Sequence, residues 1–274
     1  MSCEAASAVA GKAWKSGLAG MSTQVCSVLG FMWMRTILNY QYRHGGSMFH
    51  VGYSLWEKGG LPRFYRGVVP ALIIAPLARF GDTATNDGML MMLKGKELST
   101  ATKTMAASTC SASLRIVLLP LDKWETMKQV RGKDGLKLVI DMARSKPSSL
   151  WFGGAGAFSS AFVGHFVYFF TFNKYSEQIL PRHGGVAKTL LNGGVGFAAG
   201  ALADTCANPL SVLKTIRQTS SEQISYAETA RRVIAQDGLR GLLARGLQTR
   251  ILANGLQGAF FMVGWRWIVD CQAT

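Results

Sequence analysis

The chain has 274 residues, of which 49% are hydrophobic and only 16% are charged, and its mean hydropathy is +0.17. Soluble domains carry about 25% charged residues, so the composition argues against an ordinary soluble protein. The formal net charge is +15. Because the basic residues alternate with long apolar runs, anionic lipid headgroups are a better expected partner than nucleic acid.

Six runs have few or no charged residues. They lie at 18–34, 67–92, 105–119, 153–172, 189–207 and 251–264. One of them, 153–172, has the 20 residues that span a bilayer as a helix, and the others are shorter or interrupted, as expected of tilted helices with one face toward water. Between the members of each successive pair lies a polar stretch of helical character, at 47–58, 134–145 and 223–236. Such stretches suit short amphipathic helices at a membrane surface. The sequence therefore predicts an all-α membrane protein with six transmembrane helices.

The third run ends at Pro120, and dense charge follows, which is typical of a membrane helix that kinks. Similar stretches begin at 30, 120 and 209, at spacings of 90 and 89 residues. A period this regular predicts three tandem repeats in one domain over 1–274. The repeats are placed at about 14–95, 99–181 and 186–270.

The five cysteines are scattered and lack Cys-x-x-Cys spacing, so we expect neither a disulfide framework nor a zinc site. Cys26, Cys110 and Cys206 are interpreted as small buried packing residues. Residues 1–15 lack the apolar core of a secretory signal and contain no arginine, so targeting information is expected inside the chain. No Ser/His/Asp or Cys/His pattern has credible spacing, so we expect no enzyme and no cofactor.

Each polar stretch leads to a junction that opens the next helix: Tyr65-Arg66-Gly67, Trp151-Phe152-Gly153 and Leu243-Ala244-Arg245-Gly246. Members of the mitochondrial carrier family carry Pro-x-acid-x-x-base on each kinked helix, and Pro120 and Asp122 match the proline and the acid of this motif. Together with the junctions, this match makes the chain resemble that family over about 14–270. The resemblance implies three helix–matrix helix–helix repeats around a pseudo-threefold axis, in the mitochondrial inner membrane. It also implies bound cardiolipin, because free N–H groups at helix starts attract phosphate. The lipid contacts would be Tyr65, Arg66, Gly67, Trp151 and Gly153.

In that family, a ring of ion pairs between the acid of one repeat and the base of the next closes the matrix side. The acid positions fall here at Met32, Asp122 and Ser211, and the base positions at Arg35, Glu125 and Lys214. Only Asp122 and Lys214 are expected to pair. Met32 would face Glu125 and Ser211 would face Arg35, so two sides of this matrix gate are expected to lack an ion pair.

Residues seven before the acid positions share their helix face, and these are Val25, Arg115 and Asp204. Intramembrane charges usually face a bundle interior or pair with each other, so Arg115 and Asp204 are either a substrate-binding pair or a mutual ion pair. The resemblance places further substrate contacts on the even-numbered helices. They are Arg79, Ser160, Ala161 and Asn254. His165 lies five residues beyond Ser160, off that face, and is interpreted as a packing residue.

Two functions remain open. One is transport of a small anionic or zwitterionic metabolite by alternating access through a central site, with Arg79 and Arg115 opposite Asp204. The alternative is a transport-silent structural subunit of a larger inner-membrane assembly, such as a respiratory-chain complex. The incomplete gate favours the second function, and the polar residues kept on the inward helix faces favour the first.

Overall fold

The computed structural model describes residues 3–93, 99–179, 185–220 and 224–273, and in these ranges the secondary structure is helical. The long helices are α1 (Cys3–His44), α4 (Val68–Met92), α5 (Thr100–Val117) with α6 (Leu119–Arg131), α8 (Gly154–Ile179), α9 (Gly185–Thr219) and α11 (Leu247–Ala273). The short helices are α2 (Met48–Glu57), α3 (Gly60–Phe64), η1 (Gly132–Asp134), α7 (Gly135–Ser145), η2 (Pro147–Trp151) and α10 (Tyr226–Ala244). The predicted all-α class is confirmed for these residues.

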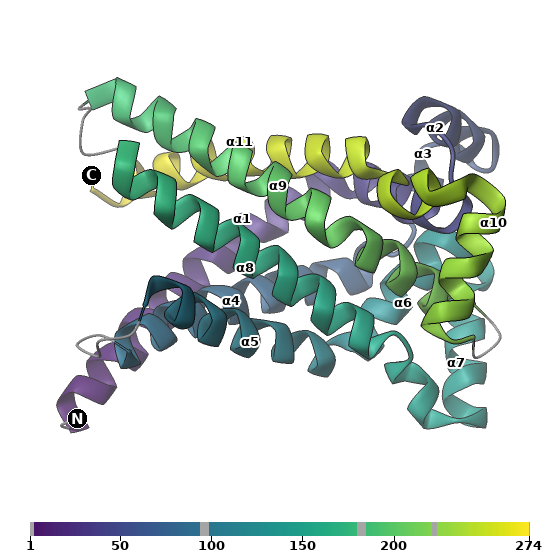
Figure 1. Ribbon diagram of the computed structural model, residues 1–274, viewed down its shortest axis with the longest axis horizontal. Helices are drawn as coiled ribbons and strands as arrows, with labels where there is room; N and C mark the ends of the chain where they lie inside the picture. The colour runs from purple at the N-terminus through teal and green to yellow at the C-terminus, as the bar shows by residue number, and fades with distance from the viewer. Residues whose placement is uncertain (1–2, 94–98, 180–184, 221–223, 274) are drawn as a thin grey trace.

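Along the chain, short helices separate the members of each long-helix pair, in the order long, short, long. Neighbouring long helices pack in sequence order from α1 through α4, α5, α8 and α9 to α11, and α11 packs back against α1. Figure 1 shows the short helices gathered at one end of the molecule and both termini at the other. The predicted polar stretches coincide with α2, α7 and the first part of α10.

The kink predicted near Pro120 is present. α5 ends at Val117, α6 begins at Leu119, and the chain bends by 66° at this break. Pro120 is the second residue of α6, where its missing N–H leaves no helical hydrogen bond unmade. α9 continues through Pro209, and α1 runs unbroken past Gly30.

Three glycines fix the starts of α4, α8 and α11. Gly67, Gly153 and Gly246 have φ of +97°, +98° and +67°, a region that favours glycine. Each glycine also lies against a helix of another pair. A β-carbon at Gly67 would lie 3.1 Å from the main-chain oxygen of Glu125 in α6, and Gly153 and Gly246 approach α9 and α1 as closely. The junction motifs therefore hold neighbouring helix pairs together.

Among the described residues, one helix is long and apolar enough to cross a membrane by itself, at Pro147–Tyr175. The bent pair Ala101–Val117 and Leu119–Ser145 is a second candidate. The sequence predicted six spans, and charged side chains such as Asp82, Asp204 and Arg250 lower the apolarity of the other long helices. Six crossings stay a prediction.

The packed interior follows the inner faces of the long helices. One apolar cluster joins α1 to α4 through Val28, Met32, Ala71 and Ala75. The predicted burial of Cys26, Cys110 and Cys206 is wrong, since all three are exposed. Their neighbours in the helix, including Ser27 and Val28 beside Cys26, occupy the packed face instead.

Candidate functional site

The end that carries the short helices is closed by contacts among α1, α6 and α9. Asp122 on α6 binds Lys214 on α9, with 2.7 Å between Oδ2 and Nζ. The Gln218 amide donates a second hydrogen bond to the same carboxylate oxygen at 2.7 Å. The predicted Asp122–Lys214 pair is therefore present, and it joins α6 to α9.

A second ion pair joins α1 to α6, and the prediction that this side would lack one is wrong. Arg35 Nη1 lies 3.5 Å from Glu125 Oε1, and only 8% of the Glu125 side chain is exposed. Gln129 donates to Glu125 at 2.9 Å and accepts a hydrogen bond from Asn39. Arg35 lies three residues beyond Met32, on the same helix face, and its long side chain reaches the carboxylate that Met32 cannot bind.

The third side, between α9 and α1, contains hydrogen bonds. The Tyr42 hydroxyl donates to Asn208 Oδ1 at 3.1 Å, and Arg43 donates to the Ile216 carbonyl at 2.9 Å. The described contacts of Ser211 are with Ser160, Ala207 and Arg250. Two ion pairs and one hydrogen-bonded side thus link the three helices pairwise.

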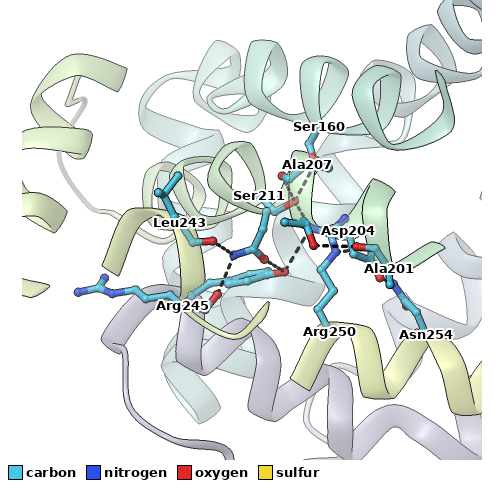
Figure 2. Close-up of polar contacts among 12 residues, drawn as sticks. Ser160, Ala201, Asp204, Ala207, Ser211, Leu243, Arg245, Arg250 and Asn254 are labelled. Atoms are coloured by element: carbon cyan, nitrogen blue, oxygen red, sulfur yellow. Dashed lines mark hydrogen bonds and ion pairs between the residues drawn. The ribbon is translucent and has the colours of Figure 1, made fainter. Parts of the chain in front are cut away.

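A polar cluster on α9 and α11 adjoins this closure (Figure 2). Asp204 is buried, and its two carboxylate oxygens accept hydrogen bonds from Arg250 Nε and Asn254 Nδ2, each at 2.7 Å. Figure 2 shows both α11 side chains pointing toward Asp204. Asn254 and Asp204 were both predicted as site residues, and the structure brings them into contact.

Arg250 extends the same cluster toward α1 and α8. Its Nη1 donates to the Ser211 hydroxyl at 2.7 Å and to the Tyr42 hydroxyl at 3.4 Å. Ser211 in turn shares a 2.7 Å hydrogen bond with the predicted site residue Ser160. Ala161, the next residue of α8, is half-buried. One guanidinium therefore connects four long helices through Asp204, Ser211, Tyr42 and Ser160.

Arg115 belongs to a different cluster, so the mutual Arg115–Asp204 ion pair, one of the two alternatives, is wrong. Arg115 Nη2 lies 2.5 Å from Asp82 Oδ2 on α4, and His165 Nε2 on α8 lies 3.7 Å from the same oxygen. A shared helix face does not determine the neighbouring helix that a side chain reaches. Arg115 reaches α4, whereas Asp204 reaches α11, and the single predicted site becomes two clusters.

The comparisons with known proteins agree with this helical arrangement. Residues 186–270 match the family model described as mitochondrial carrier protein. Over this stretch, which coincides with the third of the predicted repeats, the chain is similar to the mitochondrial carrier family. No curated protein matches the chain. Members of this family are multi-pass transporters of the mitochondrial inner membrane.

The sequence analysis did not predict two residues of these clusters, Arg250 and Asp82, although the helical spacing indicated each of them. Arg250 lies four residues before Asn254, so both share a face of α11. Asp82 lies three residues after Arg79, so both share a face of α4. If Asn254 and Arg79 face the centre of the carrier, their charged neighbours one turn away face it too.

The predicted lipid contacts differ in their surroundings. The Tyr65 hydroxyl donates to the Leu29 carbonyl at 3.1 Å, whereas Trp151 is 46% exposed. Beside them, burial and the neighbouring charge of Arg66 lower the pKa of Arg63 to about 10. Arg63 remains charged at neutral pH and donates to the Gln129 carbonyl at 2.7 Å. Lipid contact by the predicted residues stays a prediction.

The described residues contain no group of three or more His, Cys, Asp or Glu side chains that could hold a metal ion. The polar groups of the two clusters instead come from guanidinium, carboxylate, amide and hydroxyl groups. Such groups bind organic ions by hydrogen bonds and charge.

Proposed function

We propose that the carrier moves a small anionic or zwitterionic metabolite across the mitochondrial inner membrane by alternating access. The observation that carries the proposal is the closure of α1, α6 and α9 at one end. All three sides of the closure are polar, and Arg35, Asp122 and Lys214 form its ion pairs across different helices. Polar contacts of this kind can be exchanged for water when the helices separate.

The energies suit a gate that opens reversibly. The side chains of Asp122 and Lys214 are 27% and 22% exposed, so the pair is neither fully exposed nor fully buried. Exposed ion pairs contribute about 0–1 kcal/mol to stability, and breaking a buried pair costs about 3–5 kcal/mol. The free energy needed to break this pair should lie between these values. A conformational equilibrium of a few kcal/mol keeps a minor state populated, and a ligand with different affinities for the two states shifts it.

The charges of the two clusters favour an anion or a zwitterion. Arg79 lies one turn from Asp82 on α4 and acts electrostatically on His165, so it belongs with the cluster of Asp82 and Arg115. Arg79, Arg115 and Arg250 then contribute three guanidinium groups, and Asp82 and Asp204 contribute two carboxylates. One positive charge is therefore in excess. An incoming carboxylate can form charge-assisted, bidentate hydrogen bonds with a guanidinium. The amide of Asn254 and the hydroxyl of Ser160 add uncharged groups for the rest of the substrate.

The test is uptake by proteoliposomes that contain the purified carrier. A panel of labelled mono- and dicarboxylates, amino acids and phosphate would identify a substrate by saturable uptake. We expect Arg79→Ala to lower uptake strongly, whereas Arg144→Ala, on the exposed side of α7, leaves it unchanged. Full uptake by the Arg79→Ala variant would show that the assigned site is wrong.

The proposal includes the lipid environment. Six membrane crossings would place the Gly67 and Gly153 junctions near the headgroups, where cardiolipin phosphate can accept hydrogen bonds from free N–H groups at the starts of α4 and α8. The net charge of +15 supports binding to an anionic membrane. Tyr65, Arg66 and Trp151 lie at the same junctions.

A second function, as a structural subunit of a respiratory-chain complex, is favoured by the surface of α2. Phe49, Tyr53 and Trp56 follow a spacing of four and three residues on one helix face and are 87%, 67% and 57% exposed. Exposed aromatic surfaces of this kind are typical of interaction sites. On a native gel of gently solubilised membranes, fixed-stoichiometry migration with a high-mass assembly would support this function, and monomeric migration would contradict it.

A further inference from the structure

Asp82, Arg115 and His165 form a compact charged cluster that comes from three helices, α4, α5 and α8. Asp82 Oδ2 lies 2.5 Å from Arg115 Nη2 and 3.7 Å from His165 Nε2. The three side chains are 17%, 32% and 22% exposed, respectively. A histidine beside a carboxylate can take up and release a proton, which an arginine does not do at physiological pH.

Two atoms of this cluster have unused hydrogen-bonding capacity. Asp82 Oδ1 and His165 Nδ1 are buried, and neither has a hydrogen-bond partner among the described residues. Buried polar atoms in native structures nearly always have hydrogen-bond partners, so two unpaired atoms in one cluster call for an explanation, and a bound ligand would supply one. Protonated His165 is a donor at both ring nitrogens, and the second donor can bind an incoming acceptor.

The burial of His165 and the charges around it together decide when it can be protonated. Asp82 and Arg79 on α4 and Arg115 on α5 act on it electrostatically. α9 also packs against α8, and its carboxylate at Asp204 is bound by Arg250 and Asn254. With neutral His165, the group of Arg79, Arg115 and Asp82 carries one net positive charge. A proton would raise it to two, which the two guanidinium groups oppose.

An anion removes this opposition. If an anion binds beside Arg79 and Arg115, the net charge falls and His165 binds a proton more readily. By linkage, protonated His165 raises the affinity for the anion by the same factor. We propose that His165 is the proton-binding residue of a proton–anion symporter, with Asp82 as its fixed counter-charge. The proton comes from water on the side where the anion enters and returns to water on the other side. This inference rests on the proposed transport function.

The experiment uses proteoliposomes with an internal pH of about 7.5 and an external pH of about 7.5 or 6.0, with the pH dye pyranine trapped inside. The probe is a transported anion from the panel whose own charge is constant in this range. We expect external acid to raise uptake about fivefold or more, within the usual range of coupling between sites. We also expect the anion to acidify the interior, and protein-free liposomes to show neither effect.

His165→Gln keeps hydrogen-bonding groups but cannot be protonated. It should retain uptake at external pH 7.5 and lose both the stimulation by acid and the internal acidification. The control is His50→Gln on the exposed side of α2, which should behave like the wild type. Wild-type uptake without internal acidification overturns the symport inference and leaves transport intact, whatever the variant does. No saturable uptake at either pH overturns the proposed function, and this inference with it.

Discussion

Removing one partner of the buried Asp204–Arg250 pair should destabilise the protein more than removing one partner of the exposed Glu228–Arg232 pair. The side chains are 9% and 15% exposed, and Asp204→Ala leaves the Arg250 guanidinium with only hydroxyl partners, Ser211 and Tyr42, among its described contacts. Removing one partner of a buried pair costs about 3–5 kcal/mol. For a domain of this size, that corresponds to a fall in the unfolding midpoint of about 6–20 °C.

A double-mutant cycle separates the pair from its surroundings. Asp204→Ala, Arg250→Ala and the double variant are purified in one mild detergent, and their thermal unfolding midpoints are compared. Because the double variant leaves no unpaired charge, it should be more stable than the sum of the single effects predicts, by about 1–3 kcal/mol. The matched control is Glu228–Arg232 on α10, 42% and 56% exposed, whose coupling should be about 0.3–0.5 kcal/mol. Additive effects at Asp204 and Arg250 would refute the reasoning.

Three further predictions concern the closed end. Gly67→Ala should lower stability by about 1–3 kcal/mol, because Gly67 has a φ of +97° and a β-carbon there would lie close to the main-chain oxygen of Glu125. Gly30 lies within α1 with open space around it, so Gly30→Ala should raise stability by up to about 1 kcal/mol. Arg35→Ala should destabilise by leaving the Glu125 carboxylate unpaired, and adding Glu125→Gln should restore part of the loss. Tyr42→Phe should cost about 0.5–1.5 kcal/mol through its lost hydrogen bonds. Thermal unfolding in detergent measures all three, and unchanged midpoints would contradict them.

The fold was predictable to the extent that it depends on local chemistry. Pro120 sets the break between α5 and α6, and Gly67 and Gly153 set the starts of α4 and α8, because only particular residues tolerate these backbone conformations. The three polar stretches were also predictable as short helices, because their hydrophobic periodicity is a property of the local sequence. The sequence was less informative about membrane crossing, because helices with charged side chains lack a clear apolar signal.

The candidate site was only partly predictable, because its contacts depend on the lengths and directions of side chains. The motif assigned an uncharged residue, Met32, opposite Glu125, but Arg35 on the same face reaches that carboxylate. Arg115 and Asp204 occupy equivalent positions on their helices, yet Arg115 binds Asp82 on α4, whereas Asp204 binds Arg250 on α11. The site residue Asn254 was predicted, and the charge beside it, Arg250, follows only from the helical spacing.

The measurement that tests alternating access most directly is uptake by charge-reversed gate variants. Asp122→Lys places two cations together and Lys214→Asp two anions, where the native pair is 2.7 Å apart. The double reversal restores opposite charges in the same place. We predict that each single variant loses most of the uptake in proteoliposomes, about tenfold for each 1.4 kcal/mol of gate energy, and that the double variant regains a large part of it. Wild-type uptake in both single variants, or no recovery in a folded double variant, would contradict a gate at this end of the carrier.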